Sequence, residues 1–217
     1  MITVHDRVGI DPKLVEAYRK ILPATIGHFT LQGFADPAIK PMARGTFVVG
    51  PAFTVRAPGL DTGALDKAYE LAQPGDIIVV DRCGDAKYAC IGDGKAALCK
   101  VNGYEAMIVD GAATDLLETV EIGFPVFSRT ISAVVGRYLG LEGEVNGVVN
   151  CGGVAVRPGD LVVADDNGVV ILDPAHAWTL IQTCLQSQER VEKRKRDRLK
   201  TLGIELPGDA SGVLRNQ

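Results

Sequence analysis

The chain has 217 residues, a formal net charge of −4, 47% hydrophobic residues and 6% aromatic residues. This length predicts one domain, and the weak charge argues against a nucleic-acid surface, which needs a concentrated positive field. The sequence lacks a stretch approaching the roughly 18 apolar residues of a membrane span, and its N-terminus lacks a secretory apolar segment, so we expect a cytoplasmic protein with no membrane partner.

The N-terminal part predicts one helix followed by irregular backbone. Asp11 and Pro12 are typical of an N-cap and a first helical position, and the apolar residues that follow share one helical face until Pro23. We therefore assign residues 1–44 to an N-terminal helical elaboration and residues 45–172 to the core.

The central part alternates strands with helices. Residues 47–55 (FVVGPAFTV) predict two β-branched strand runs, paired or consecutive, interrupted by Gly50-Pro51, and Asp61 is expected to cap the next helix. The elements predicted after Asp61 are a helix over 63–72, an apolar strand over 76–81, a helix over 95–101, a strand over 106–110, a helix over 115–122 and a strand over 125–128. This alternation indicates βαβ units and a largely parallel sheet between helical layers.

The composition of the chain changes in its C-terminal part. Residues 143–172 are dense in valine and glycine, which predicts antiparallel strands, and Asn167-Gly168 favours a type I′ hairpin turn. Residues 173–206 predict a long terminal helix. Its later part is too highly charged to be buried, and such helices commonly lean on a neighbouring subunit.

Two aspartates stand at the ends of consecutive elements. Asp93 lies just before a predicted helix, and Asp115 follows a predicted strand. Ligands of parallel sheets bind at the carboxyl ends of strands, beside helix N-termini whose free N–H groups attract anions. Gly92, Gly94 and Lys95 are placed to serve such an anion. Both aspartates are equally compatible with ordinary helix N-caps.

The order and spacing of six segments resemble the RraA-like family, which includes metal-dependent 4-hydroxy-4-methyl-2-oxoglutarate aldolases. The segments are GPAFTV, PGDIIVVD, IGDGKAAL, VDGAATD, FPVFSR and CGGVAVRPGDLVVADDNGVVIL, spread over residues 45–172. The resemblance implies a single domain over 1–217 with a layered α/β/β, swivelling-domain-like fold, a mixed sheet, flanking helices and a long C-terminal helix. The aldolase pattern D-x20-R-D is met here as D-x20-T-D, from Asp93 to Asp115, with Thr114 in the arginine position.

The resemblance also implies roles for these residues. Asp115 would bind a divalent cation (Mg²⁺ or Mn²⁺), the turn from Gly92 to Lys95 would bind a 2-oxo acid through its N–H groups, and Asp93 would orient water or move a proton. Thr114 cannot supply the charge of the missing arginine. Lys95, Arg82 or Arg129 are the candidate substitutes, and Lys95 is the nearest in sequence.

A final implication concerns assembly. The family's terminal helix is expected to lend a glutamate to a neighbour's active site, which favours a homotrimer or homohexamer. Glu192 fits this role best and Glu189 second, although a solvated charged face explains both equally simply. The chain then predicts a metal-dependent lyase that cleaves 4-hydroxy-2-oxo acids to pyruvate or decarboxylates oxaloacetate. The alternatives are a non-catalytic RraA-like regulator of an RNA-processing nuclease and, more distantly, a phosphohistidine swivelling domain.

Overall fold

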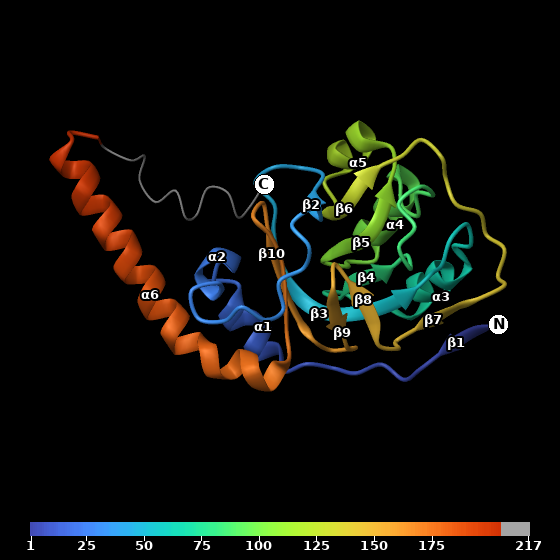
Figure 1. Ribbon diagram of the computed structural model, residues 1–217, viewed down its shortest axis with the longest axis horizontal. Coiled ribbons are helices and arrows are strands. Elements are labelled where there is room, and N and C mark those ends of the chain that lie inside the picture. Colours follow the sequence, from blue (N-terminus) through green and yellow to red (C-terminus); the bar gives the residue numbers. More distant parts are fainter. Residues whose placement is uncertain (205–217) are drawn as a thin grey trace.

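The fold is organised around β3 (Phe47–Arg56), a strand that contributes to two sheets in the computed structural model, which describes residues 1–204 (Figure 1). Its first half pairs antiparallel with β10 (Leu161–Asp165), and its second half pairs parallel with β4 (Ile77–Asp81). The expectation of two separate runs at Gly50-Pro51 is wrong. The strand continues through this dipeptide, and the pattern is interrupted there because the strand changes partners.

The larger sheet is mixed, with β3, β4, β5 (Ala106–Ala113) and β6 (Val126–Ile131) running parallel at its centre. β7 (Gly143–Val145) pairs antiparallel with β3 and parallel with β1 (Ile2–Val4), and β2 (Lys40–Pro41) pairs antiparallel with β6. Two hairpins complete the β structure: β8 (Val149–Cys151) with β9 (Val154–Val156), and β10 with β11 (Gly168–Leu172). The expected parallel centre and antiparallel C-terminal half are confirmed.

The helices occupy two outer layers. α3 (Gly63–Leu71) and α4 (Asp93–Val101) cover one face of the larger sheet, and α5 (Leu116–Ile122) follows β5. α1 (Pro12–Tyr18), α2 (Pro23–Ile26) and α6 (Pro174–Thr201) lie on the far side, against the β10–β11 hairpin (Figure 1). Each expected helix is present. The sequence did not reveal β1 or α2.

Three buried clusters separate these layers. One lies between α3, α4 and the larger sheet and contains Leu65, Ala96 and Val80. The second fills the space between that sheet and the C-terminal hairpins, and the third lies between β10–β11 and the helices α1 and α6. The all-buried burial pattern of β4 follows from this sandwiching, because helices cover one of its faces and hairpins the other.

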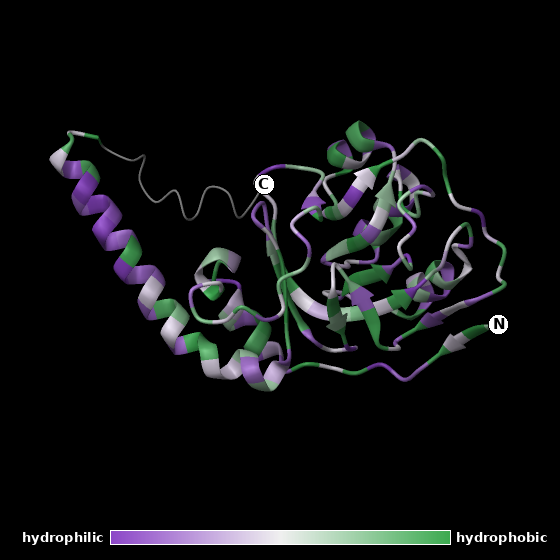
Figure 2. Ribbon diagram, viewed as in Figure 1, coloured by the Kyte–Doolittle hydropathy of each residue, from purple (hydrophilic) through white to green (hydrophobic). Residues whose placement is uncertain are grey.

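The terminal helix α6 has two unlike halves. Its first half buries Ala177, Leu180, Ile181 and Cys184 against the body, and its second half projects away from the body and is mostly hydrophilic (Figure 2). Among residues 1–204, no helix combines the length and the apolar character needed to cross a membrane. The helix was expected to reach residue 206, and residues 205 and 206 lie outside the described part of the chain.

The hairpin turn between β10 and β11 differs from the expectation. Asp165 pairs with Gly168, so the turn residues are Asp166 and Asn167. Neither has the positive φ that a type I′ turn requires, and only Gly168 lies at positive φ, with a value of 144°. Asp165 also accepts a hydrogen bond from the Asn167 N–H at 2.8 Å. This side-chain contact supports the turn in place of the left-handed backbone.

Candidate functional site

The backbone at Asp115 is left-handed, where β5 ends and α5 begins. Its φ of 52° and ψ of 52° make it one of three non-glycine residues with positive φ in the described part of the chain, with Cys83 and Asn146. Such conformations cost roughly 1–3 kcal/mol each and concentrate at functional sites. Asp115 is exposed and occupies the N-cap position of α5, but its side chain makes no capping bond to that helix.

The Asp115 carboxylate lies beside the start of α4. Its Oδ2 accepts a 3.3 Å hydrogen bond from the N–H of Asp93, and its Oδ1 accepts a 3.2 Å bond from the hydroxyl of Thr114. Thr114 is itself nearly buried. A Cβ atom at Gly92 would overlap Asp115 Oδ2, so glycine is what allows this close approach. The structure therefore brings together four of the predicted site residues.

The first turn of α4 is open to solvent, with Asp93, Gly94 and Lys95 all exposed. Gly92 is its N-cap and offers no side chain, while Asp93 Oδ1 accepts the Gly94 N–H at 2.6 Å. A Cβ at Gly94 would meet nothing within 4 Å, so open space lies over that position. Backbone N–H groups at a helix start attract anions, and the residues of this turn are exposed.

Lys95 points across to α3. Its ammonium donates to Asp66 Oδ1 at 2.6 Å and lies 4.9 Å from the centroid of the Tyr69 ring. Its side chain is about half exposed. The positive charge of Lys95 is thus partly balanced by the carboxylate of Asp66.

The two arginines considered as substitutes are engaged elsewhere. The Arg82 side chain is fully buried and donates to carbonyl oxygens, including that of Ala57 at 2.6 Å and that of Gly59. Arg129 binds Asp110 and Asp36 at 2.7 and 2.8 Å. Arg82 is a structural bridge between loops, and Arg129 is an ion-paired residue, so neither fills the place of the missing arginine.

The donor set at Asp115 suits a hard cation. Its carboxylate supplies oxygen, which Mg²⁺ and Mn²⁺ prefer, and Mg²⁺ retains several waters when bound by one or two carboxylates. Within residues 1–204 there is no group of three or more His, Cys, Asp or Glu side chains placed to hold a metal. The residues present therefore fit a cation that is completed by water and by substrate oxygens, and they do not form a closed protein cage.

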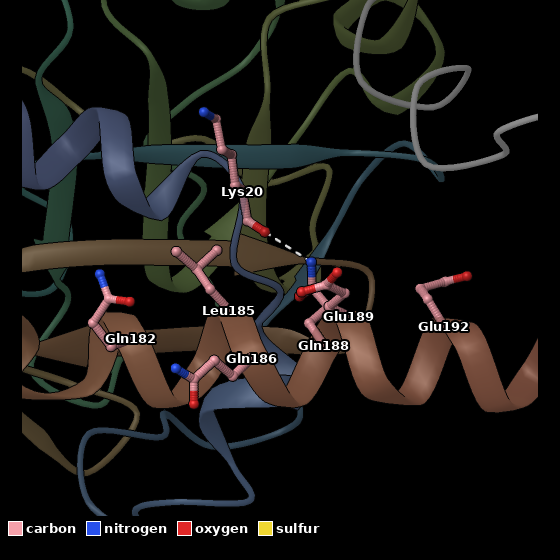
Figure 3. A pocket seen from close by; sticks show the side chains of 7 residues that line it. All are labelled: Lys20, Gln182, Leu185, Gln186, Gln188, Glu189 and Glu192. Atoms are coloured by element: carbon pink, nitrogen blue, oxygen red, sulfur yellow. Dashed lines mark hydrogen bonds between the residues drawn. The ribbon is translucent and has the colours of Figure 1, made fainter.

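Glu192 belongs to α6, which lies on the other side of the molecule from α4 and α5 (Figure 1). It lines a groove along α6 that also includes Lys20, Leu185 and Gln188, where Gln188 Nε2 donates to the Lys20 carbonyl at 2.8 Å (Figure 3). The carboxylate of Glu192 lies 3.7 Å from Lys195 of the same helix. Its assignment to a neighbour's site stays a prediction.

Sequence reasoning missed Asp66 and Tyr69 as partners of Lys95. The available signal was their place in the first turns of the helix preceding β4, at the same sheet edge as Lys95. Among three cysteines that flank this segment in sequence, Cys83 is exposed, whereas Cys90 and Cys99 are buried. Burial raises the pKa of Cys90 to about 11 and that of Cys99 to about 12, so both stay protonated.

A family model described as RraA-like (Aldolase/RraA) matches residues 5–171. A protein of Halalkalibacterium halodurans named "Putative 4-hydroxy-4-methyl-2-oxoglutarate aldolase" is 35% identical over 179 residues, covering 82% of this chain and 85% of that protein. A protein of the same name from Paraburkholderia phytofirmans is 30% identical over 141 residues, covering 64% and 84%.

Solved structures share the fold. Streptomyces coelicolor RraAS2, described as an unusual member of the RNase ES inhibitor RraA protein family, superposes with a TM-score of 0.75 at 28% identity, covering 87% of this chain and 98% of that chain. RraA from Thermus thermophilis, described as an RNA-processing inhibitor, gives a TM-score of 0.62 at 25% identity, covering 70% and 91%.

Proposed function

The chain belongs to the RraA-like family, and from this membership we propose that it is a divalent-metal-dependent lyase acting on small 2-oxo acids. The reaction is retro-aldol cleavage of a 4-hydroxy-2-oxo acid to pyruvate, decarboxylation of oxaloacetate, or both. The observation that carries the proposal is the Asp115 carboxylate, turned back by left-handed backbone onto the first turn of α4.

Both reactions make the same demand on the site. A C–C bond breaks, its electron pair forms the enolate of pyruvate, and a proton must then be supplied at C3. The other product is CO2 in decarboxylation; in the retro-aldol reaction it is a carbonyl compound, formed as a base takes the C4 hydroxyl proton. A divalent cation held by Asp115 would supply Lewis-acid stabilisation of the charge that develops on the keto oxygen. The N–H groups between Gly92 and Lys95 would hold the substrate carboxylate and fix its orientation.

Asp93 is the proposed proton carrier. Its side chain is exposed at the open end of the turn, where its Oδ1 accepts the Gly94 N–H. A carboxylate in this place orients water against the substrate and exchanges protons with it. Thr114 replaces the arginine of the family pattern, and its hydroxyl donates to Asp115. We propose that Thr114 orients the metal ligand and that the substrate range differs from that of relatives carrying arginine.

The direct test is oxaloacetate decarboxylation with Mg²⁺ or Mn²⁺, before and after EDTA. We expect EDTA to abolish the rate, metal to restore it, and Asp115→Asn to lower kcat/KM on the order of a hundredfold or more, as loss of transition-state charge stabilisation does. Glu118→Gln, which removes another acid from the first turn of α5, is the matched control and should retain the rate. A rate that is insensitive to EDTA, or equal losses in both variants, would contradict the proposal.

A further inference from the structure

Two lysines hold α4 between its neighbouring helices. Lys100, in the last turn, donates to the Ile122 carbonyl at the end of α5, and Lys95, in the first turn, donates to Asp66 on α3. These lysines are five positions apart, which turns them about 140° from each other around a helix of 3.6 residues per turn. The Lys95 contact is therefore a lateral support for α4 on its α3 side.

The support acts on the weakest part of the helix. Gly92 and Gly94 give the first turn backbone freedom, and the N-cap has no side chain to satisfy its N–H groups. Two hydrogen bonds restrain these N–H groups through acceptors that ligand binding would disturb, Asp93 Oδ1 and Asp115 Oδ2. The Asp66–Lys95 contact joins two side chains and occupies none of these N–H groups.

Tyr69 makes this support rigid. Its ring lies 4.9 Å from the Lys95 ammonium, which is within the range of a cation–π contact. The side chain is nearly buried, and its backbone carbonyl accepts the Tyr104 hydroxyl at 2.6 Å. The ring is thus a fixed platform, one helical turn beyond Asp66, that limits where the ammonium can move.

We propose that Asp66 is a positioning residue for 2-oxo acid binding: through Lys95 it fixes the first turn of α4, whose N–H groups receive the substrate carboxylate. This inference rests on the proposed function, because the ligand is the proposed substrate class. A positioning role for Asp66 and a direct role for Lys95 predict opposite changes in pyruvate affinity when Asp66 is removed. If Lys95 contacts the substrate itself, Asp66 competes for its charge, and removing Asp66 tightens binding.

The experiment measures pyruvate affinity with Mg²⁺ by calorimetry, together with amide hydrogen exchange of residues 93–95. We expect Asp66→Asn to weaken pyruvate binding about fivefold and Lys95→Met about tenfold, because the latter also loses the ring contact. Exchange at residues 93–95 should accelerate in both. The charge-swapped double variant, Asp66→Lys with Lys95→Asp, should return to within about threefold of wild type, since the pair is rebuilt with reversed signs.

Glu70→Gln is the matched control, because it breaks the 2.6 Å Lys67–Glu70 pair on the same helix without touching α4. It should leave affinity and exchange unchanged, and all variants should keep the thermal midpoint of wild type. Asp66→Asn binding pyruvate as tightly as wild type or more tightly, or a swapped variant no better than Lys95→Met, overturns the inference while leaving the proposed function standing. A wild-type protein that binds no pyruvate with Mg²⁺ overturns both.

Discussion

At the scale of single residues, two glycines of one turn have opposite reasons for being glycine. Asp115 and Thr114 occupy the space where a side chain at Gly92 would be, whereas the corresponding space at Gly94 is open. Neither has positive φ, so backbone strain plays no part in either case. Gly92 is thus required by close packing, whereas we expect Gly94 to keep the turn accessible.

Alanine at these two positions should therefore act in opposite ways. Gly94→Ala should raise the free energy of unfolding by about 0.5–1 kcal/mol, because alanine loses less entropy in a helix, yet its methyl group should weaken pyruvate binding roughly tenfold or more by filling the access space. Gly92→Ala should lower stability by about 1–3 kcal/mol, since its methyl group must displace Asp115. Urea unfolding and calorimetry with pyruvate and Mg²⁺ measure both. Equal losses of stability at the two positions would show that the open space at Gly94 is not there.

The sequence predicted where the residues of the candidate site lie in the fold, but it did not predict how their backbone and side chains are oriented. Asp93 and Asp115 could be placed at one sheet edge because βαβ alternation fixes which strand ends and helix starts meet. The left-handed backbone of Asp115 was not predicted, because an aspartate after a strand is also compatible with an ordinary helix N-cap. The destination of Lys95 was equally hidden, since it depends on how α3 and α4 pack side by side.

At the scale of elements, one carboxylate binds the last part of the segment between β6 and β7. Asp61 was expected only to cap the following helix, and it does accept the Gly63 N–H at 2.8 Å. It also accepts the N–H groups of Leu139, Gly140, Leu141 and Glu142, at 2.7–3.2 Å. These four bonds join residues 78–81 positions apart in sequence, which no local pattern reveals.

This carboxylate should make stability depend on acid pH. Burial by itself raises the pKa of Asp61, but its backbone N–H donors outweigh burial and lower the pKa to about 2. Because the folded pKa lies below the unfolded value of about 3.9, the stabilisation is complete above pH 4 and is lost as the pH falls towards 2.

Asp61→Asn should lower the free energy of unfolding near neutral pH by about 2–4 kcal/mol, because an amide nitrogen then faces backbone donors. It should also flatten the dependence of stability on pH between about 4 and 2. Urea unfolding across this pH range measures both effects, with exposed Asp6→Asn as control. A variant whose pH profile is parallel to that of wild type would show that Asp61 does not carry the acid sensitivity.

Two further carboxylates bind the β8–β9 hairpin. Asp81, the last residue of β4, is the register partner of Asp110 within β5, and the two accept the N–H groups of Asn150 and Gly152 at 3.0 and 2.7 Å. The valine-rich pattern predicted that antiparallel strands follow residue 143, but it could not place this hairpin against the parallel sheet. That placement depends on two aspartates which, from sequence alone, appeared only as strand ends.

At the scale of the whole molecule, the hydrophobic pattern of the sequence accounts for the layers. It does not account for the direction in which the charged half of α6 projects. Buried strands between helical segments account for the sheet and both helical layers. The charged half of α6 has the same helical period as the packed half, but it extends past the body, away from α4 and α5 (Figure 1). A site completed by a neighbour is the arrangement that would give this half a catalytic role, and we propose a homotrimer or homohexamer on that basis.

Subunit complementation tests this arrangement. Glu192→Gln and Asp115→Asn should each inactivate oxaloacetate decarboxylation alone, whereas Glu189→Gln, one turn earlier on α6, should remain active. If Glu192 serves the adjacent subunit, refolding the two inactive variants together in equal amounts should restore activity at about a quarter of the sites, since an intact Asp115 then meets an intact Glu192 across an interface. Light scattering checks that mixed and single variants share one oligomeric mass. A mixture as inactive as its components, at an unchanged mass, would mean that Glu192 acts on no neighbouring site. A Glu192→Gln variant as active as Glu189→Gln would mean that its charge belongs to a solvated helix face.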